Sequence, residues 1–485
     1  MDNIVKVRSF RINGNHVSPC IIECSVSDGI GIHLVGLADA STKESLLRVV
    51  TALQYKGYRI PGKKIIINVA PDARIGGSCH LDLPIAIALL FASGQVAMAA
   101  DAQTSILENC MFAGELGLNG SIRNISHSLQ AVLLNQNVGL LRLTILPKEN
   151  ALDAYAVTRD RGVVAVSDLD DVIAGLKGDK ETCKRTSAWQ ITGTCDRTDR
   201  DRFKEIGNTP LFDEQRLRAA MIAAAGGFGI LCTGPYEANA YHMGELIREL
   251  IPSPDDTSTS LEIDKVLSMC NKPYGDTMKI TPMEDVDANP YGIFGTVYNF
   301  GALPLVHKGV LLVRNAEKLD DATITRIYDV YRDKELVLKK DGREIAYPSD
   351  FLPVMTANTN KAVKAYRSVD LLPMKTELHP LPSGMTPDAR IFGFARSAVA
   401  VAQRIAYGRG GCLNARLNDE QMARLLEGND DALAVIGKIV TTLKLERRER
   451  NNIIRIARTI ADINNHNRIQ PEDIGEAAGY VHHIK

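Results

Sequence analysis

One segment of the sequence joins a short apolar run to a polar loop and then to a helix-like stretch. The apolar run covers residues 230–233, the loop covers 234–241, and the helix-like stretch covers 243–250. A strand, a glycine-led loop and a helix in this order form the setting of a phosphate-binding loop, whose motif is G-x-x-x-x-G-K-[ST]. The sequence therefore predicts an α/β sheet with such a loop at the end of one strand.

The side chains that give such a loop its chemistry are missing here. Asn239 stands at the second glycine position, Ala240 at the lysine position and Tyr241 at the Ser/Thr position. In a working loop the lysine contacts the β- and γ-phosphates, and the hydroxyl binds Mg²⁺. Each lost charge-assisted hydrogen bond costs roughly 1.5–3 kcal/mol, or about ten- to a hundredfold in affinity. The loop predicts the frame of an ATPase without the groups that hold and activate ATP.

Composition limits the remaining classes of protein. A chain of 485 residues exceeds one ordinary core, so about two to four domains are expected. The net charge of −1 gives no overall attraction to nucleic acid or membrane. The chain has no apolar run of membrane-spanning length and no signal peptide, so a cytoplasmic location without membrane association is expected. Its nine cysteines include no C-x-x-C pair, which argues against a zinc site and a disulfide framework.

The order of strand and helix patterns predicts an α/β protein in several parts. Residues 1–177 alternate strand and helix signals, with a buried strand at 64–70, a buried helix from Asp82 and a hairpin turn at Asn119-Gly120. Residues 178–208 are polar and charged, which predicts a linker. Strand and helix patterns resume in 209–386, with buried strands at 309–313 and 351–357. Residues 387–485 are helical, with a helix capped by Asn418 and Gln421 and one long helix over 443–463.

Several blocks of sequence resemble one known family. The N-terminal domain of the ComM/YifB group of magnesium-chelatase-like AAA+ proteins is similar to IHLVGLADASTKESLLRVVTALQYKGYRIPGKKIIINVAP, HLDLPIAIALL and GELGLNGSIR. The two nucleotide-site strands of the family resemble AAAGGFGILCTGP and LVHKGVLLV, and its helical lid resembles IIRIARTIADI and EAAGYV. The resemblance implies a Lon-protease-like, S5-like domain at 1–177, a linker at 178–208, a degenerate AAA+ core at 209–386 and a C-terminal helical lid at 387–485.

The resemblance also implies roles for individual residues of a nucleotide site. Active members end the second strand in Asp-Glu, which bind the metal and orient the attacking water, whereas this chain has Arg314 and Asn315. Asn358 matches the polar sensor residue, and Arg448 matches a lid arginine that reaches the phosphates. The predicted vestigial site comprises Gly234, Pro235, Glu237, Ala240, Tyr241, Arg314, Asn315, Asn358 and Arg448. No catalytic residue, no metal and no cofactor are expected, beyond weak binding of ATP or ADP.

Other interpretations of these residues stay open. Asn358 also suits a turn, and Arg448 also suits a solvated helix face. Glu237 and Arg314 are charge-reversed occupants of the loop and the strand tip, and they are predicted to pair across the vacated site. Two unrelated surface charges are the alternative.

The favoured function is that of a non-hydrolysing ComM/YifB-like protein acting as an assembly or DNA-processing accessory. The resemblance implies a homo- or hetero-oligomeric ring, with DNA and an active AAA+ relative as candidate partners. A basic face on the lid is predicted to contact DNA phosphates through Arg447, Arg448, Arg450, Arg455 and Arg458, with a solvated helix as the alternative. One competing function is an ATP-dependent DNA branch-migration motor with substitute residues. A less favoured one is a peptidase using Ser78, Cys79 and His80, which are better explained as a loop before a helix.

Overall fold

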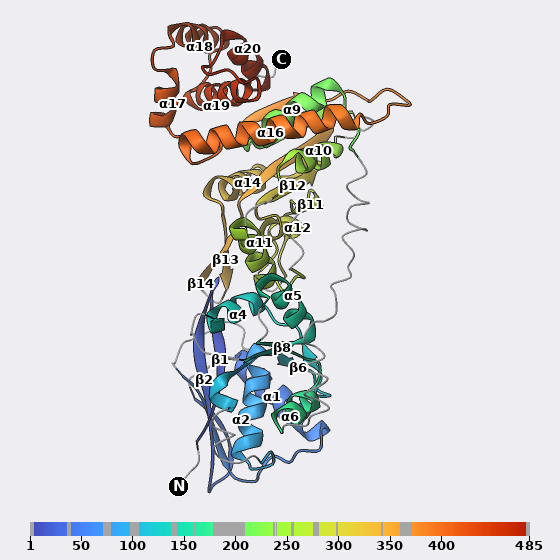
Figure 1. Cartoon of the computed structure of the whole chain (residues 1–485), viewed down its shortest axis with the longest axis vertical. Coiled ribbons are helices and arrows are strands. Elements are labelled where there is room, and N and C mark those ends of the chain that lie inside the picture. The colour runs from blue at the N-terminus through green and yellow to red at the C-terminus, as the bar shows by residue number, and fades with distance from the viewer. Residues whose placement is uncertain are drawn as a thin grey trace. The chain divides into compact units, whose positions relative to one another are not determined.

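A computed structural model describes most of the chain, and its contacts divide it into two compact units (Figure 1). Unit 1 comprises Met1–Asp199, Ser260–Thr277 and Lys339–Tyr347, and unit 2 comprises Arg200–Thr259, Met278–Leu338 and Pro348–Lys485. The predicted boundaries at residues 177, 208 and 386 stay predictions. The structure describes residues 4–35, 40–70, 79–97, 106–136, 143–159, 162–177, 209–235, 238, 240–253, 257–274, 281–296, 299–340, 343–358 and 371–481.

Unit 1 is built on a seven-stranded mixed sheet with the order β3-β4-β2-β1-β5-β8-β9. Strands β1, β2 and β4 pair antiparallel, and the other neighbours pair parallel. Alternate side chains of β4 are buried, as its run of isoleucines predicts for a strand with one face in the core. The strands are β1 Val5–Asn13, β2 His16–Ser27, β3 Gly31–Val35, β4 Lys64–Ala70, β5 Cys110–Phe112, β8 Leu143–Pro147 and β9 Val163–Val166.

Helices and one small hairpin complete the N-terminal part of unit 1. The helix predicted from Asp82 is α2, and ten of its eleven residues are buried because its sequence is almost wholly apolar. The predicted Asn119-Gly120 turn is confirmed: Gly120 has φ +84° and joins β6 Glu115–Leu116 to β7 Ile122–Arg123. The helices are α1 Ala40–Tyr55, η1 Cys79–Leu81, α2 Asp82–Ala92, α4 Ser128–Gln136, α5 Lys148–Thr158 and α6 Leu169–Leu176.

Helix α11 (Thr257–Met269) comes from the middle of the chain but contributes most of its length to unit 1. The Ser268 carbonyl accepts a hydrogen bond from the His127 amide at 2.8 Å. The Ser268 hydroxyl accepts one from the Leu129 amide at 3.0 Å, and the Tyr274 hydroxyl lies 2.7 Å from that of Ser128. These contacts satisfy amides that the first turn of α4 leaves without partners inside the helix. The sequence patterns did not predict this pairing.

Unit 2 contains a five-stranded parallel sheet with the order β11-β12-β15-β10-β16. Its central strands are apolar on both faces, as expected for a sheet covered by helices on both sides. The strands are β10 Ile230–Gly234, β11 Met283–Asp287, β12 Gly309–Arg314, β15 Phe351–Asn358 and β16 Met374–Glu377. Of the two remaining strands, β13 Glu335–Lys340 belongs mostly to unit 2 and β14 Arg343–Pro348 mostly to unit 1. The helices around the sheet are α9 Glu214–Gly226, α10 His242–Leu250, α12 Pro290–Phe294, α13 Ala302–Leu305, η4 Ala316–Lys318 and α14 Asp321–Asp333.

The C-terminal part of unit 2 is helical, as predicted. It contains α16 Ala389–Gly410, η6 Asn414–Arg416, α17 Asp419–Leu426, α18 Asp430–Leu443, α19 Arg447–Ile463 and α20 Pro471–Val481. The predicted capping box of Asn418 and Gln421 is present at the start of α17. The single helix predicted over 443–463 is wrong at its start: Lys444 adopts a left-handed φ of +54°, which ends α18, and α19 begins at Arg447.

The observed architecture confirms the predicted α/β fold class with a helical C-terminal region. Within the described ranges, no helix combines the length and the apolar character that crossing a membrane requires.

Candidate functional site

The candidate site lies where the parallel strands of unit 2 end. Gly234, the last residue of β10, stands beside Asn358, the last residue of β15. Strand β12 is the other neighbour of β15, and Arg314 at its end stands beside Asp287 of β11. The crevice outside the carboxyl ends of such strands is the usual ligand position in open α/β sheets. The fold thus brings Gly234, Arg314 and Asn358, which are far apart in sequence, to one edge.

The described part of the loop is held by close backbone packing. A side chain at Gly234 would place its Cβ 2.5 Å from the Leu378 carbonyl oxygen, so only glycine fits there. The Ala238 amide donates to the Pro235 carbonyl at 2.9 Å, and the Ala238 side chain is buried. Tyr236, Glu237 and Asn239 lie outside the described residues.

The motif expects a lysine at position 240 and a Ser or Thr at position 241, and neither side chain is present here. Ala240 packs with its methyl group against the apolar core of unit 2. Tyr241 is 41% exposed, and its ring lies 4.1 Å from the ring of His242 at the start of α10. An apolar methyl group and an aromatic ring therefore occupy the lysine and Ser/Thr positions.

Arg216 of α9 is a buried cation that holds this loop, and sequence analysis missed it. Its side chain is almost completely buried, and its Nη2 donates to the Ala238 carbonyl at 2.8 Å. The same nitrogen donates to the His379 carbonyl beyond β16, and Nη1 pairs with the Asp213 carboxylate. The one signal in the sequence is the i, i+3 spacing of Asp213 and Arg216 at the helix start. The guanidinium therefore ties the loop to the end of the neighbouring strand.

Replacing Arg216 with methionine is expected to lower the free energy of unfolding of unit 2 by about 2 kcal/mol. The loss arises because two buried carbonyl oxygens would no longer receive a hydrogen bond. Hydrogen exchange of peptides from α9 and β10 would measure it. The matched control is Arg218→Met on the same helix α9: Arg218 pairs with the partly exposed Glu476 of α20, and its loss should cost less than about 1 kcal/mol. Equal losses in the two variants would contradict the assigned role of Arg216.

The positions of the acidic motif on β12 are engaged in contacts with β11. Arg314 Nε lies 2.8 Å from Asp285 Oδ1, and both side chains are about half exposed. Asn315 has a left-handed φ of +55°, and its Nδ2 donates to Asp287 Oδ1 at 2.6 Å. This hydrogen bond lowers the pKa of the Asp287 carboxyl below its usual value. The two carboxylates at this edge, those of Asp285 and Asp287, belong to β11. They pair with Arg314 and Asn315, which stand at the positions that the resemblance assigns to Asp-Glu.

The other predicted site residues are Asn358, Arg448 and Glu237. The backbone N–H of Asn358 donates to Glu317 Oε2 at 3.3 Å, at the exposed end of β15. Arg448 lies in the first turn of α19 and is partly buried, and its contact with phosphates stays a prediction. The proposed pair of Glu237 and Arg314 also stays a prediction, because Glu237 lies outside the described residues. In the ranges that the structure describes, no group of three His, Cys, Asp or Glu side chains is placed to hold a metal ion.

The residues considered for a peptidase are not arranged for catalysis. His80 is buried, its Nε2 lies 2.9 Å from the Phe10 carbonyl oxygen, and its ring stacks on that of Phe10. Burial lowers the pKa of His80 to about 4 and raises the pKa of the Cys79 thiol to about 12. A histidine and a thiol with these pKa values do not form a base and nucleophile near neutral pH. Ser78 lies outside the described residues.

The buried His80 is expected to make unit 1 less stable in acid. Its pKa is about 4 in the folded state and about 6.5 when unfolded, so the unfolded chain binds more protons between these values. The free energy of unfolding should therefore fall as the pH drops from about 6.5 toward 4. Hydrogen exchange of α2 peptides should show a shallower fall in His80→Gln. Identical pH profiles for the two proteins would contradict this assignment.

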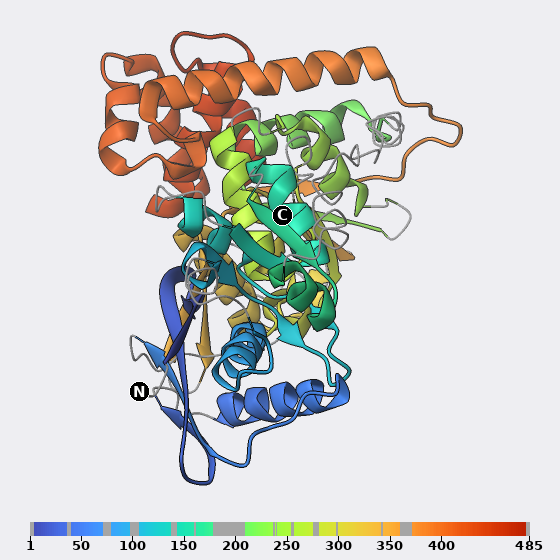
Figure 2. The same cartoon turned by 60° about the horizontal axis from the view of Figure 1, so that its bottom comes forward.

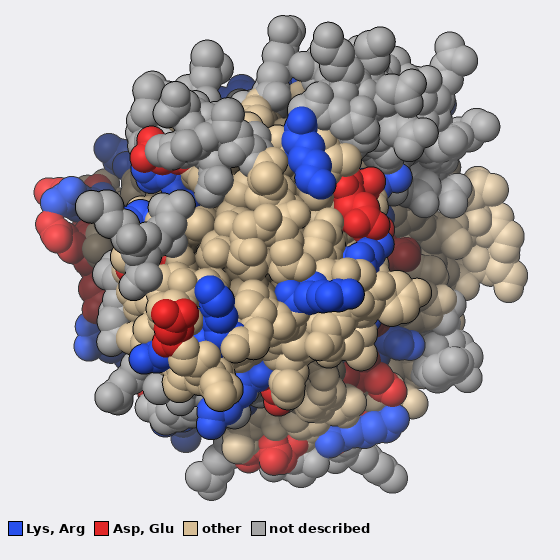
Figure 3. All heavy atoms as spheres, turned by 90° about the horizontal axis from the view of Figure 1, so that it is seen from below, with Lys and Arg blue, Asp and Glu red and all other residues tan. Residues whose placement is uncertain are grey.

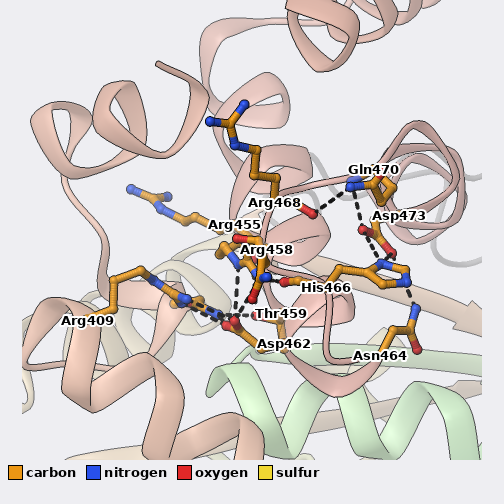
Figure 4. A network of polar contacts seen from close by, with 12 residues as sticks. Arg409, Arg455, Arg458, Thr459, Asp462, Asn464, His466, Arg468, Gln470 and Asp473 are labelled. Carbon is orange, nitrogen blue, oxygen red and sulfur yellow. Dashed lines mark hydrogen bonds and ion pairs between the residues drawn. The ribbon is translucent and has the colours of Figure 1, made fainter. Parts of the chain in front are cut away.

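The predicted basic face of the lid is wrong for Arg458. Arg458 is buried, it pairs with Asp462 Oδ1 at 2.9 Å, and it donates to the His466 carbonyl at 2.7 Å (Figure 4). Arg455 is partly buried and donates to the Leu417 carbonyl at 2.6 Å. Arg455 and Arg458 lie on the side of α19 that packs inside the helical part of unit 2, so their guanidinium groups bond within the protein.

The face of the molecule drawn in Figure 3 shows no second basic face among its described atoms. Lys, Arg, Asp and Glu side chains are scattered there over a mostly uncharged surface, and the described atoms show no continuous basic patch. Exposed apolar side chains of unit 1 include Leu47 and Tyr55 of α1, which are 68% and 71% exposed. DNA binding stays a prediction.

Comparisons with known proteins identify the chain at the level of family. Three family models match in succession: "Subunit ChlI of Mg-chelatase" at residues 22–150, "Magnesium chelatase, subunit ChlI" at 211–371, and "Magnesium chelatase, subunit ChlI C-terminal" at 394–481. "Uncharacterized protein YifB" of Salmonella typhimurium is 26% identical over 96% of this chain and 95% of its own length. "Competence protein ComM" of Haemophilus influenzae is 27% identical over 95% of this chain and 94% of its own length. The chain therefore belongs to the magnesium-chelatase ChlI-like family and is a relative of the proteins named YifB and ComM.

Proposed function

We propose that this protein is a ChlI-like chain that does not hydrolyse ATP and works as an assembly or DNA-processing accessory. The observation that carries the proposal is the state of the β12 terminus. Asn315 uses its amide to donate to Asp287, and Arg314 pairs with Asp285. By the family resemblance these two residues stand where an active member has the Asp-Glu pair that serves Mg²⁺ and the attacking water. An amide is not a general base, and a guanidinium beside the metal position repels the ion.

The loop supports the same proposal from the other side of the site. Ala240 contributes a methyl group to the core, and the carbonyl of Ala238 accepts from Arg216. Ala238 and Ala240 are thus held by contacts within the protein, which supports a role that needs no bound nucleotide.

The proposal extends to the location and the partners of the protein. We place the protein in the cytoplasm as a member of a homo- or hetero-oligomeric ring, with an active AAA+ relative as one candidate neighbour. The DNA-processing part of the proposal draws on the relative named a competence protein. Retained ATP or ADP affinity would be weak, because each lost phosphate contact costs roughly 1.5–3 kcal/mol.

Calorimetric titration of the full chain with ATP, with and without Mg²⁺, tests the proposal. We expect no binding stronger than about millimolar, which corresponds to roughly −4 kcal/mol, and no effect of Mg²⁺. Micromolar, metal-dependent binding would overturn the proposal in favour of an ATP-driven motor. Hydrolysis that disappears in Asn358→Ala would then support the use of substitute residues.

A further inference from the structure

Helix α16 carries two apolar stripes, and only one of them is buried in unit 2. The buried stripe consists of Phe392, Ala395, Val399, Ala402 and Ala406. The second, which we call the open stripe, consists of Ile391, Phe394, Ala398, Val401 and Ile405. Phe394 is 78% exposed, Ile391 51% and Val401 46%. Figure 2 shows α16 as the long orange helix along the top of the view.

The spacing of the open stripe is that of a coiled-coil seam. Its residues follow one another at intervals of three, four, three and four, which places them at the a and d positions of successive heptads. A helix that lies in a lipid surface presents a broad apolar face instead. Here the other half of the apolar arc is already buried in the core, so only a narrow stripe remains open. Its width and periodicity fit a second helix.

Charge next to the open stripe indicates the kind of helix that would fit. Arg390 and Arg404 are exposed and occupy the g position beside the stripe, with Ser397 between them at the same position. Helix α16 contains no Asp or Glu. Charges at the e and g positions select partners of opposite sign in coiled coils. An exposed aromatic residue within an apolar stripe is a common anchor for a partner protein.

We propose that the open stripe of α16 docks an amphipathic helix of a partner protein with Glu or Asp beside its apolar seam. Phe394 and Val401 would insert into that seam, and Arg390 and Arg404 would pair with its carboxylates. A second copy of the same helix fits less well, since it would set arginines against arginines. The proposal is independent of whether the nucleotide site is active.

Two synthetic peptides of three heptads test the proposal with the full chain. Both carry Leu at a and d; one has Glu at e and g, which keeps it monomeric by repulsion, and the other has Lys there. Fluorescence anisotropy should show at least about tenfold tighter binding of the Glu peptide. Phe394→Ser should weaken that binding by about tenfold or more. The double variant Arg390→Glu/Arg404→Glu should reverse the preference between peptides.

The matched control is Arg396→Glu, which makes the same charge change at the f position, on the far side of α16 from the open stripe. It should leave binding of the Glu peptide within about twofold. Equal binding of both peptides, or no effect of Phe394→Ser, overturns the proposal. Two other results also overturn it: binding to phosphatidylserine vesicles with neither peptide bound, and a dimer in sedimentation that Phe394→Ser abolishes.

Discussion

Replacing Asp462 with alanine is expected to lower the free energy of unfolding of the helical part of unit 2 by about 3–5 kcal/mol. Asp462 is buried and accepts from both terminal nitrogens of Arg409, at 2.8 and 2.7 Å. It also pairs with the buried Arg458 at 2.9 Å and accepts from Asn414 Nδ2 at 2.9 Å. The substitution would leave two guanidinium groups without their carboxylate, one of them deep in the domain (Figure 4). Breaking a buried pair costs more than the pair contributes, because the remaining charge stays desolvated.

Hydrogen exchange of peptides from α19 measures this loss within unit 2, without requiring the whole chain to unfold in one step. The matched control is Asp419→Ala, because Asp419 pairs with the exposed Arg447 and should cost less than about 1 kcal/mol. An α19 that exchanges equally fast in both variants would show that the network does not stabilise the helical domain. Asp462→Asn should fall between them, since it keeps one acceptor oxygen but loses the second acceptor and the charge.

Restoring the missing loop residues is expected to create ATP binding at least ~100-fold tighter than that of the natural chain. The loop variant carries Asn239→Gly, Ala240→Lys and Tyr241→Thr. Its lysine and threonine would recover two phosphate and metal contacts, each worth roughly 1.5–3 kcal/mol. Adding Arg314→Asp and Asn315→Glu should then make the binding depend on Mg²⁺ and allow hydrolysis.

Calorimetry with ATP measures the affinity, and phosphate release measures turnover. The variant with only the β12 substitutions is the control, because it restores the metal position without a loop that holds phosphate. A folded loop variant with unchanged affinity would contradict the placement of this segment as a former phosphate loop. That result would leave the docking of a helix on α16 untouched, since the open stripe belongs to a separate helix.

The strands of the nucleotide frame were predictable because their signals are local. The apolar runs at 230–233, 309–313 and 351–357 became β10, β12 and β15 with shifts of at most one residue at an end. Buried parallel strands need continuous apolar sequence, so composition over a few residues is sufficient. The edge strands β11 and β16 escaped prediction, since MEDVD and MKTE are short and mostly polar and have neither an apolar run nor a sustained alternation.

The missed features depend on how the elements pack and on the backbone conformation, which the sequence patterns do not show. Arg216 looks like an ordinary helix residue until β16 and the loop close around its guanidinium. Arg458 was expected at the surface because it stands in an arginine-rich run, yet α19 turns it toward Asp462. The break between α18 and α19 occurs at Lys444, whose backbone is left-handed. A lysine side chain gives no signal for this conformation, which glycine usually adopts.

The sequence by itself determined that the segment from Gly234 lacks the lysine and the Ser/Thr hydroxyl of the phosphate-loop motif, because a motif is a matter of residue identity. It also determined the α/β class, because apolar periodicity is local. Only the tertiary structure decided what the residues at this edge contact: Arg314 pairs with Asp285, Asn315 donates to Asp287, and the loop accepts from Arg216. Those pairs join β12 to β11 and the loop to α9, and side chains meet across elements only once the sheet order and register are set.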